Sequence, residues 1–104
     1  VYEKIFDEID SIVLQSIQAI QNNDFELLGQ LMNVNHGLLN TLQISTPEIE
    51  RLIMIARESG ALGAKLTGGG GGGAIIALCK DIDSTKSAIE SEGYKTLVVE
   101  IHNP

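Results

Sequence analysis

Apolar side chains recur every three or four residues through the first half of the chain, which is the period of an α-helix. This spacing predicts one helix over residues 2–22 and a second over residues 25–43. Asp24 is placed to cap the second helix with its carboxylate. Gly29 and Gly37 should weaken that helix, because each glycine costs roughly 1 kcal/mol relative to alanine in a helix interior.

Turn and capping residues predict two further helices. The segment 45–48 (STPE) is a strong helix start, because serine or threonine caps, proline fits the first turn and glutamate complements the helix dipole. Gly60 fits a left-handed cap at the end of this third helix. Asp81, Asp83 or Ser84 can cap a short fourth helix, and Gly93 is expected to end it.

The hydrophobic period changes after the third helix. Residues 61–67 are expected to form a short strand, and the near-continuous apolar run 74–80 (AIIALCK) predicts a strand that is buried on both faces. Residues 94–101 have Leu, Val and Ile at their centre and predict a third strand.

This order of elements predicts one α+β domain over residues 1–104, with a small, mainly antiparallel sheet and helices packed on one face. Three strands leave two exposed edges. A ferredoxin-like plait would require a fourth strand ahead of the first helix, and no strand pattern is visible there. Because the chain also begins at Val1 rather than Met, we expect it to be a fragment of a longer protein.

Composition narrows the class of partner. The 104 residues include 14 acidic and 7 basic side chains, and the net charge of −7 disfavours binding to nucleic acid and to anionic membranes. No apolar run approaches the ~20 residues that a transmembrane helix needs. Cys79 is the only cysteine, so no intrachain disulfide can form and a reducing cytoplasm is the simplest setting. Its apolar surroundings indicate a buried, inert thiol. The sequence has no pair of His or Cys residues at the spacing of metal ligands, so nothing in it indicates a metal site.

Six consecutive glycines, from Gly68 to Gly73, separate the first two predicted strands. They are not a P-loop, because Lys65 precedes the glycines and a strand, not a helix, follows them. Without Cβ atoms the backbone can approach another group closely, and successive N–H groups can hold an anion. The residues leave two interpretations open, a flexible turn and a close-approach surface whose ordering cost is offset by contacts.

Three side chains are candidate site residues, and each has an alternative structural role. Lys65 could carry positive charge to a phosphate or be an ordinary solvent-facing strand lysine. Thr67 could donate its hydroxyl to a substrate or simply end its strand. His36, with Asn33 and Asn35, could face a cleft or be a polar interruption of the second helix that local backbone groups satisfy.

Several stretches of the sequence together resemble one superfamily. The segment 60–74 (GALGAKLTGGGGGGA) resembles the third, glycine-rich motif of the GHMP kinases, a superfamily of small-molecule kinases. With the segment 31–39 (LMNVNHGLL) and the segment 45–47 (STP), the resemblance is greatest to the mevalonate kinase branch. Gly69 and Ala74 replace the alanine and cysteine that are usual in the family, and both changes are small enough for a tight loop.

The resemblance implies a ferredoxin-like α+β domain that forms the C-terminal part of a two-domain kinase. In such an enzyme ATP, assisted by Mg²⁺, donates a phosphoryl group to the 5-hydroxyl of mevalonate. This reaction is a step of isoprenoid biosynthesis in the cytoplasm. The N-terminal domain would carry the nucleotide phosphate loop and the catalytic Asp and Lys, so this chain alone is expected to be inactive and to bind no cofactor. Its partners would be its own N-terminal domain and the small-molecule substrate, with a homodimer as a further option.

The resemblance also implies that one set of residues forms a wall of the substrate and phosphate site. The set comprises Lys65, Thr67, Gly68, Gly69, Gly70, Gly71, Gly72 and Gly73, with His36 as a candidate cleft-facing residue. The alternatives are another GHMP kinase, such as phosphomevalonate or homoserine kinase, a non-enzymatic ferredoxin-like module that binds a small molecule, and an interaction domain that pairs through its sheet edges.

Overall fold

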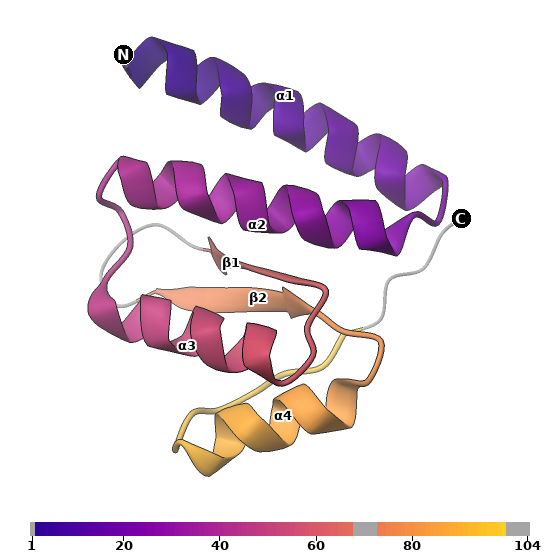
Figure 1. The fold of residues 1–104 in the computed structure, drawn as a ribbon, viewed down its shortest axis with the longest axis vertical. Coiled ribbons are helices and arrows are strands. Elements are labelled where there is room, and N and C mark those ends of the chain that lie inside the picture. The colour runs from indigo at the N-terminus through magenta and orange to yellow at the C-terminus, as the bar shows by residue number, and fades with distance from the viewer. Residues whose placement is uncertain (1, 68–72, 100–104) are drawn as a thin grey trace.

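The computed structural model describes residues 2–67 and 73–99, which form four helices and one two-stranded hairpin (Figure 1). The elements are, in chain order, α1 (Tyr2–Gln21), α2 (Phe25–Thr41), α3 (Pro47–Glu58), β1 (Gly63–Thr67), β2 (Ala74–Leu78) and α4 (Ile82–Ser91). α1 contacts α2, α2 contacts β1, α3 contacts both strands, and α4 contacts α3. The hairpin therefore lies between α2 and α3, with α1 and α4 as the outer helices (Figure 1).

Two helices begin with the predicted capping chemistry. Asp24 caps α2 by accepting a hydrogen bond from the Leu27 N–H. Thr46 caps α3 by accepting from the Ile49 N–H, and Pro47 occupies the first turn. Both starts depend on side chains that lie within three residues of the groups they satisfy, which is why the sequence alone predicts them.

α4 begins at one of its predicted capping residues. Its N-cap is Asp81, and the Asp81 carboxylate accepts both the Ser84 N–H and the Ser84 hydroxyl, the latter at 2.7 Å. One carboxylate thus satisfies two donors of the first turn, and the other two candidate caps, Asp83 and Ser84, lie inside the helix. Gly93 follows the end of α4 with a φ of +90°, as predicted.

Gly60 terminates α3 in the predicted left-handed conformation, with a φ of +106°. The Ala61 N–H donates to the Ala56 carbonyl, and the Gly60 N–H donates to the Arg57 carbonyl. This pair of bonds satisfies the last carbonyl groups of the helix and turns the chain directly toward β1.

β1 and β2 form the predicted antiparallel pair, with Gly63 opposite Leu78 at one end. The prediction that the second strand is buried on both faces is wrong. Ile75 and Ala77 pack against the core that α3 supplies, but Ile76 is 48% exposed. The reason is that α3 covers only one face of the hairpin, while α2 reaches β1 at its outer edge.

The predicted third strand over residues 94–101 does not form in its described part, and its last two residues lie outside the described residues. The Tyr94 hydroxyl donates to Glu48 of α3, and the Thr96 hydroxyl donates to a glutamate of α4. These side-chain bonds hold the segment against the two helices rather than against β2. Leu97 is consequently 88% exposed, so β-propensity alone misassigned this segment.

Two hydrophobic cores lie on either side of the contact between α2 and β1. One joins α3, the hairpin and α4, and the other joins α1 and α2. The buried residues are Ile49, Leu52, Ile53, Ala56, Ala64, Leu66 and Ile89 in the first core, and Ile12, Ala19, Leu28, Leu31 and Met32 in the second.

None of the helices in the described part of the chain has the length and apolar character needed to cross a membrane.

α2 and β1 meet through backbone atoms at two glycines. A Cβ atom added to Gly29 would lie 2.5 Å from the Leu62 carbonyl oxygen, and one added to Gly63 would collide with the backbone of Gly29. Real Cβ atoms essentially never make contacts this short, so both positions require glycine. Gly29, which helix propensity marks only as a weak point, is the residue that lets the helix and the strand meet.

Replacing Gly29 or Gly63 with alanine is expected to lower the free energy of unfolding by about 1–3 kcal/mol, because overpacking forces backbone shifts. Gly37→Ala is the matched control, because it lies in the same helix and an added Cβ there would have no atom within 4 Å. It should raise the free energy of unfolding by about 0.5–1 kcal/mol. Urea denaturation followed by circular dichroism measures all three, and equal effects of Gly29→Ala and Gly37→Ala would contradict the close approach.

Candidate functional site

Three of the predicted site residues that the structure describes lie toward the end of the hairpin at which β1 leads to β2. Thr67 is exposed at the end of β1, directly opposite Ala74, and Lys65 lies on the same face of β1 two residues earlier. Gly73 leads into β2 with a φ of +38°, which favours glycine. The other predicted glycines, residues 68–72, lie outside the described residues.

Lys65 is a half-buried cation that pairs with no carboxylate among the described residues. Burial lowers the pKa of its ammonium group below the usual value. Across the hairpin it lies opposite Ile76, which offers no charge. An unpaired ammonium group in partly dehydrated surroundings is unfavourable in the free domain and forms strong hydrogen bonds with an anion.

The outer edge of β1 is closed by side chains of α2 rather than by another strand. The Ala64 N–H donates to Asn33 Oδ1 at 3.0 Å, and the Leu66 N–H donates to His36 Nδ1 at 3.0 Å. These two backbone donors lie on either side of Lys65. The backbone that carries the candidate lysine is therefore fixed from the edge by α2.

His36 is only 3% exposed, and both of its ring nitrogens have partners inside the chain. Because a backbone N–H can only donate, Nδ1 must be the acceptor, and the imidazole is neutral with its proton on Nε2. That proton is donated to Glu50 Oε2, which also accepts the Ser45 hydroxyl at 2.9 Å. The ring thus joins the backbone of β1 to α3 in one defined tautomer.

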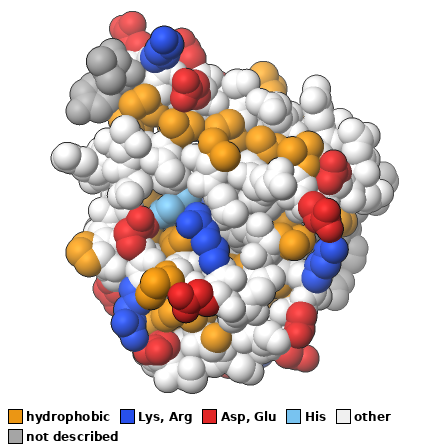
Figure 2. All heavy atoms as spheres, viewed as in Figure 1, with side chains coloured by type: hydrophobic (Ala, Val, Ile, Leu, Met, Phe, Trp, Pro, Cys, Tyr) orange, Lys and Arg blue, Asp and Glu red, His pale blue; other side chains and the backbone are white. Residues whose placement is uncertain are grey.

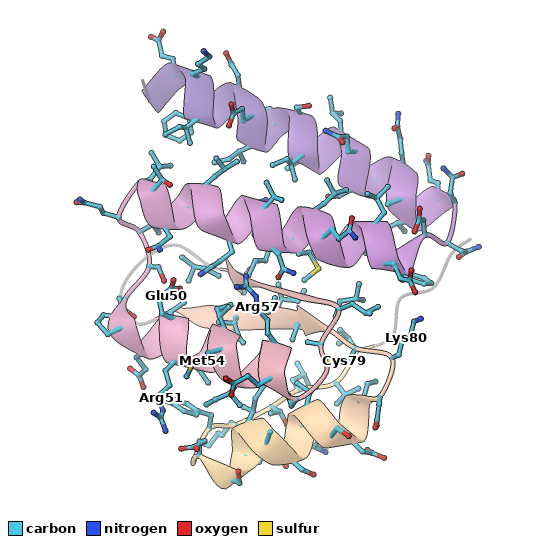
Figure 3. The ribbon with its side chains drawn as sticks, in the orientation of Figure 1. Glu50, Arg51, Met54, Arg57, Cys79 and Lys80 are labelled. Carbon is cyan, nitrogen blue, oxygen red and sulfur yellow. The ribbon has the colours of Figure 1, made fainter. Side chains whose placement is uncertain are left out.

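α3 supplies the outer partners of both α2 side chains. Figure 3 shows Glu50 and Arg57 on the side of α3 that faces α2, whereas Arg51 points away from it. Arg57 Nε donates to Asn33 Oδ1 at 3.1 Å, so this oxygen accepts from both α3 and β1. Figure 2 shows acidic and basic side chains side by side over α3 on this face. Two parallel links therefore run from β1 through α2 to α3.

His36 is not a polar interruption of the second helix satisfied by local backbone groups, which was the alternative to a cleft-facing role. α2 continues without interruption through this region, and the partners of His36 and Asn33 lie 14 to 31 positions away in the sequence rather than in the local backbone. Within the described chain the imidazole is enclosed by α2, α3 and β1. Asn35 is also buried, but its Oδ1 atom has no hydrogen-bond partner among the described residues.

Sequence reasoning missed Glu50, Ser45 and Arg57 as members of this network. Each lies in or near α3, where its spacing is that of an ordinary polar helix position or helix start. The only signal in the sequence was the polar group around His36 inside an otherwise apolar stretch of α2. That signal shows that polar partners exist and does not identify them.

Glu50 is the acidic group of this network. Burial alone would raise the pKa of its carboxyl group, but the hydrogen bonds from His36 and Ser45 outweigh burial and hold the pKa below the usual value. The positive charge of Arg57 acts in the same direction. The ionised carboxylate is therefore favoured, and it is the form that can accept from both donors.

Other candidate chemistry is sparse in the described part of the chain. It contains no group of three or more His, Cys, Asp or Glu side chains that could hold a metal ion. Cys79 lies one residue beyond the end of β2 and is half-buried, so the prediction of a buried thiol within the strand is corrected.

Comparison with known families identifies this arrangement of helices and hairpin. The family model described as GHMP kinases C terminal matches residues 16–95. The chain belongs to the GHMP kinase C-terminal family. The match includes α2, α3, both strands and α4, and hence every residue of the network at the edge of β1. The predicted resemblance is confirmed.

Relatives of this GHMP kinase domain include mevalonate kinases. It is 41% identical over 99 residues to the mevalonate kinase of Thermococcus gammatolerans, covering 94% of this chain and 29% of that protein. It is 45% identical over 76 residues to the mevalonate kinase of Methanothermobacter thermautotrophicus, covering 73% of this chain and 25% of that protein. The chain therefore spans less than a third of the length of these relatives.

A solved structure gives the same fold. The crystal structure of L. major mevalonate kinase in complex with R-mevalonate matches with a TM-score of 0.81 and 36% identity. The match covers 88% of this chain and 29% of that chain. It confirms the predicted α+β class for this GHMP kinase domain.

The stability that Glu50 contributes is expected to disappear in acid. Its folded-state pKa lies below the ordinary value of 4.5, so the contribution is present above that value and is lost as the pH falls through the folded-state pKa. The free energy of unfolding of the wild-type chain should exceed that of Glu50→Gln at neutral pH, and this difference should shrink below a pH of about 4.5.

Urea denaturation at several pH values measures the difference between the two proteins. Glu26→Gln is the control, because Glu26 is an exposed partner of Lys80 and such pairs contribute little. A difference between wild type and Glu50→Gln that does not change with pH would contradict the role assigned to the carboxylate.

Proposed function

We propose that this domain is the substrate-side part of a kinase that transfers the γ-phosphate of ATP to the 5-hydroxyl of mevalonate. The proposal rests on the end of the hairpin at which β1 finishes, where the exposed hydroxyl of Thr67 shares one face with Lys65, which pairs with no carboxylate among the described residues. Membership of the GHMP kinase family and the identity to mevalonate kinases support it. The solved L. major enzyme is in complex with R-mevalonate, which supports the same substrate.

Phosphoryl transfer depends mainly on positioning and on neutralising charge. The Lys65 ammonium group would neutralise an anionic oxygen of the phosphate or the substrate, and Thr67 would donate one hydrogen bond to it. The substrate hydroxyl oxygen would attack the γ-phosphorus, its proton would pass to a base outside this chain, and ADP would leave. This chain would therefore supply positioning groups and none of the proton transfer.

The remaining parts of the reaction are assigned to an N-terminal domain of a longer polypeptide. The chain spans only 29% of the Thermococcus gammatolerans enzyme. We accordingly place the ATP loop, Mg²⁺ and the catalytic Asp and Lys in that domain, which is the proposed partner of this one. Cytoplasmic isoprenoid biosynthesis belongs to the same proposal.

A chimera tests the proposal. This chain replaces the segment of the Thermococcus gammatolerans mevalonate kinase that it matches, and ADP release is measured with mevalonate, phosphomevalonate or homoserine as the acceptor. We expect turnover with mevalonate only, and none by the isolated chain. A folded chimera that is inactive with mevalonate would refute the assigned function, and turnover by the isolated chain would refute the assignment of the catalytic groups to another domain.

Lys65→Met in the chimera is expected to separate activity from stability. The substitution removes an ammonium group that has no carboxylate partner in the described chain, so the melting temperature should stay the same or rise. If Lys65 neutralises charge in the transition state, kcat/KM should fall roughly a hundredfold or more. Lys80→Met is the matched control, because Lys80 is an exposed lysine paired with Glu26 and should change neither quantity appreciably. Normal activity of Lys65→Met would exclude its role.

A further inference from the structure

The side chains of Asn33 and His36 hold β1 in a single register. These residues are three positions apart on α2, about 4.5 Å of helix rise, whereas Ala64 and Leu66 are two positions apart, about 6.6 Å along a strand. The short Asn33 side chain and the longer His36 ring compensate for this mismatch, and each accepts a backbone N–H at 3.0 Å. A shift of β1 by one residue would turn both N–H groups away from α2.

The bond to Leu66 depends on the state of the imidazole. Nδ1 can accept only while the ring carries its single proton on Nε2, and Glu50 holds that proton in place. Ser45 in turn donates to the same Glu50 oxygen and restricts the carboxylate. A series of hydrogen bonds therefore runs from Ser45 through Glu50 and His36 to the Leu66 N–H. It leads from the start of α3 to the backbone of β1, between Lys65 and Thr67.

We propose that His36 is a positioning residue for phosphoryl transfer, which with Glu50 fixes the β1 backbone so that Lys65 and Thr67 face the reacting groups. This inference rests on the proposed function, because it concerns the same site. Both nitrogens of the buried ring are bonded inside the chain, so the ring acts through Leu66, the residue that joins Lys65 to Thr67.

The expected consequence is kinetic. Without an acceptor at Nδ1, the Leu66 N–H would be left unpaired at a buried edge, and β1 would shift to find another partner. A displacement of about 1 Å in a positioned group can slow a reaction roughly a hundredfold. Because Lys65 and Thr67 would act mainly on the transition state, the loss should fall on kcat more than on KM.

Two substitutions separate the two ring nitrogens of His36. In His36→Asn the amide oxygen can take the place of Nδ1 and still accept the Leu66 N–H, while the reach to Glu50 is lost. In His36→Gln the longer amide can reach Glu50 but places no acceptor at the position of Nδ1. Gly37→Ala is the matched control, because an added Cβ at this neighbouring position would meet open space.

All variants are made in the mevalonate kinase chimera, and kcat, KM and hydrogen exchange at the Leu66 amide are measured. We expect His36→Asn to keep kcat within about threefold, and His36→Gln to lose roughly ten- to a hundredfold in kcat with little change in KM. Exchange at Leu66 should be faster than in the wild type only in His36→Gln. If the two folded variants have the same kcat and the same exchange rate at Leu66, the proposal is overturned. This holds whether or not both variants have a lower kcat than the wild type.

The two proposals fail separately. If the wild-type chimera does not phosphorylate mevalonate, the proposed function is lost, while exchange at Leu66 still shows whether His36 holds β1. If His36→Gln does not fold, Glu50→Gln takes its place, because this carboxylate is partly exposed at 40%. It should lower kcat several-fold at an unchanged KM, and an unchanged kcat in this folded variant would overturn the proposal.

Discussion

The fold depends on the backbone contact between α2 and β1 at Gly29 and Gly63. Without Cβ atoms at these positions, the helix approaches the strand closely enough for Asn33 and His36 to reach its edge. A larger residue at either position would force the two backbones to shift, at a cost of about 1–3 kcal/mol. The apolar cores on the two sides are joined at this contact, so its geometry also sets how α1 and α3 are placed relative to the hairpin.

The same contact protects the edge of a very small sheet. An exposed strand edge is a template for pairing with other chains, and proteins usually cover, charge or shorten it. Here a helix covers one edge with two specific acceptors, one an amide oxygen and one a ring nitrogen, instead of with another strand. β1 is correspondingly buried, whereas Ile76 of β2 is half exposed. The strand that carries Lys65 and Thr67 is thus the one that is held on its edge as well as on its face.

Features that depend on neighbours in the sequence could be predicted, and features that depend on distant contacts could not. Asp24, Thr46 and Gly60 each bond to groups within a few residues, so their roles follow from the residue type and its position. Helix propensity marks Gly29 only as destabilising, because the contact that requires glycine there is with a segment more than thirty residues away. His36 is similar, since its partners are 14 and 30 positions distant and no periodicity in the sequence reports them.

The charge at the candidate site runs against the charge of the whole chain. A net charge of −7 gives an overall field that disfavours anions, so an anion site must be made locally, and Lys65 is the cation available at the loop end of the hairpin. A carboxylate partner would relieve the cost of its burial, but it would also compete with the anion that the site is proposed to bind. The acid of the neighbouring network is occupied elsewhere, because Glu50 accepts from His36 and Ser45 and forms no ion pair with Lys65. The Glu50 carboxylate of the network that fixes β1 is therefore held by its own hydrogen bonds. The ammonium group of Lys65 is left without a neutralising partner within the described chain.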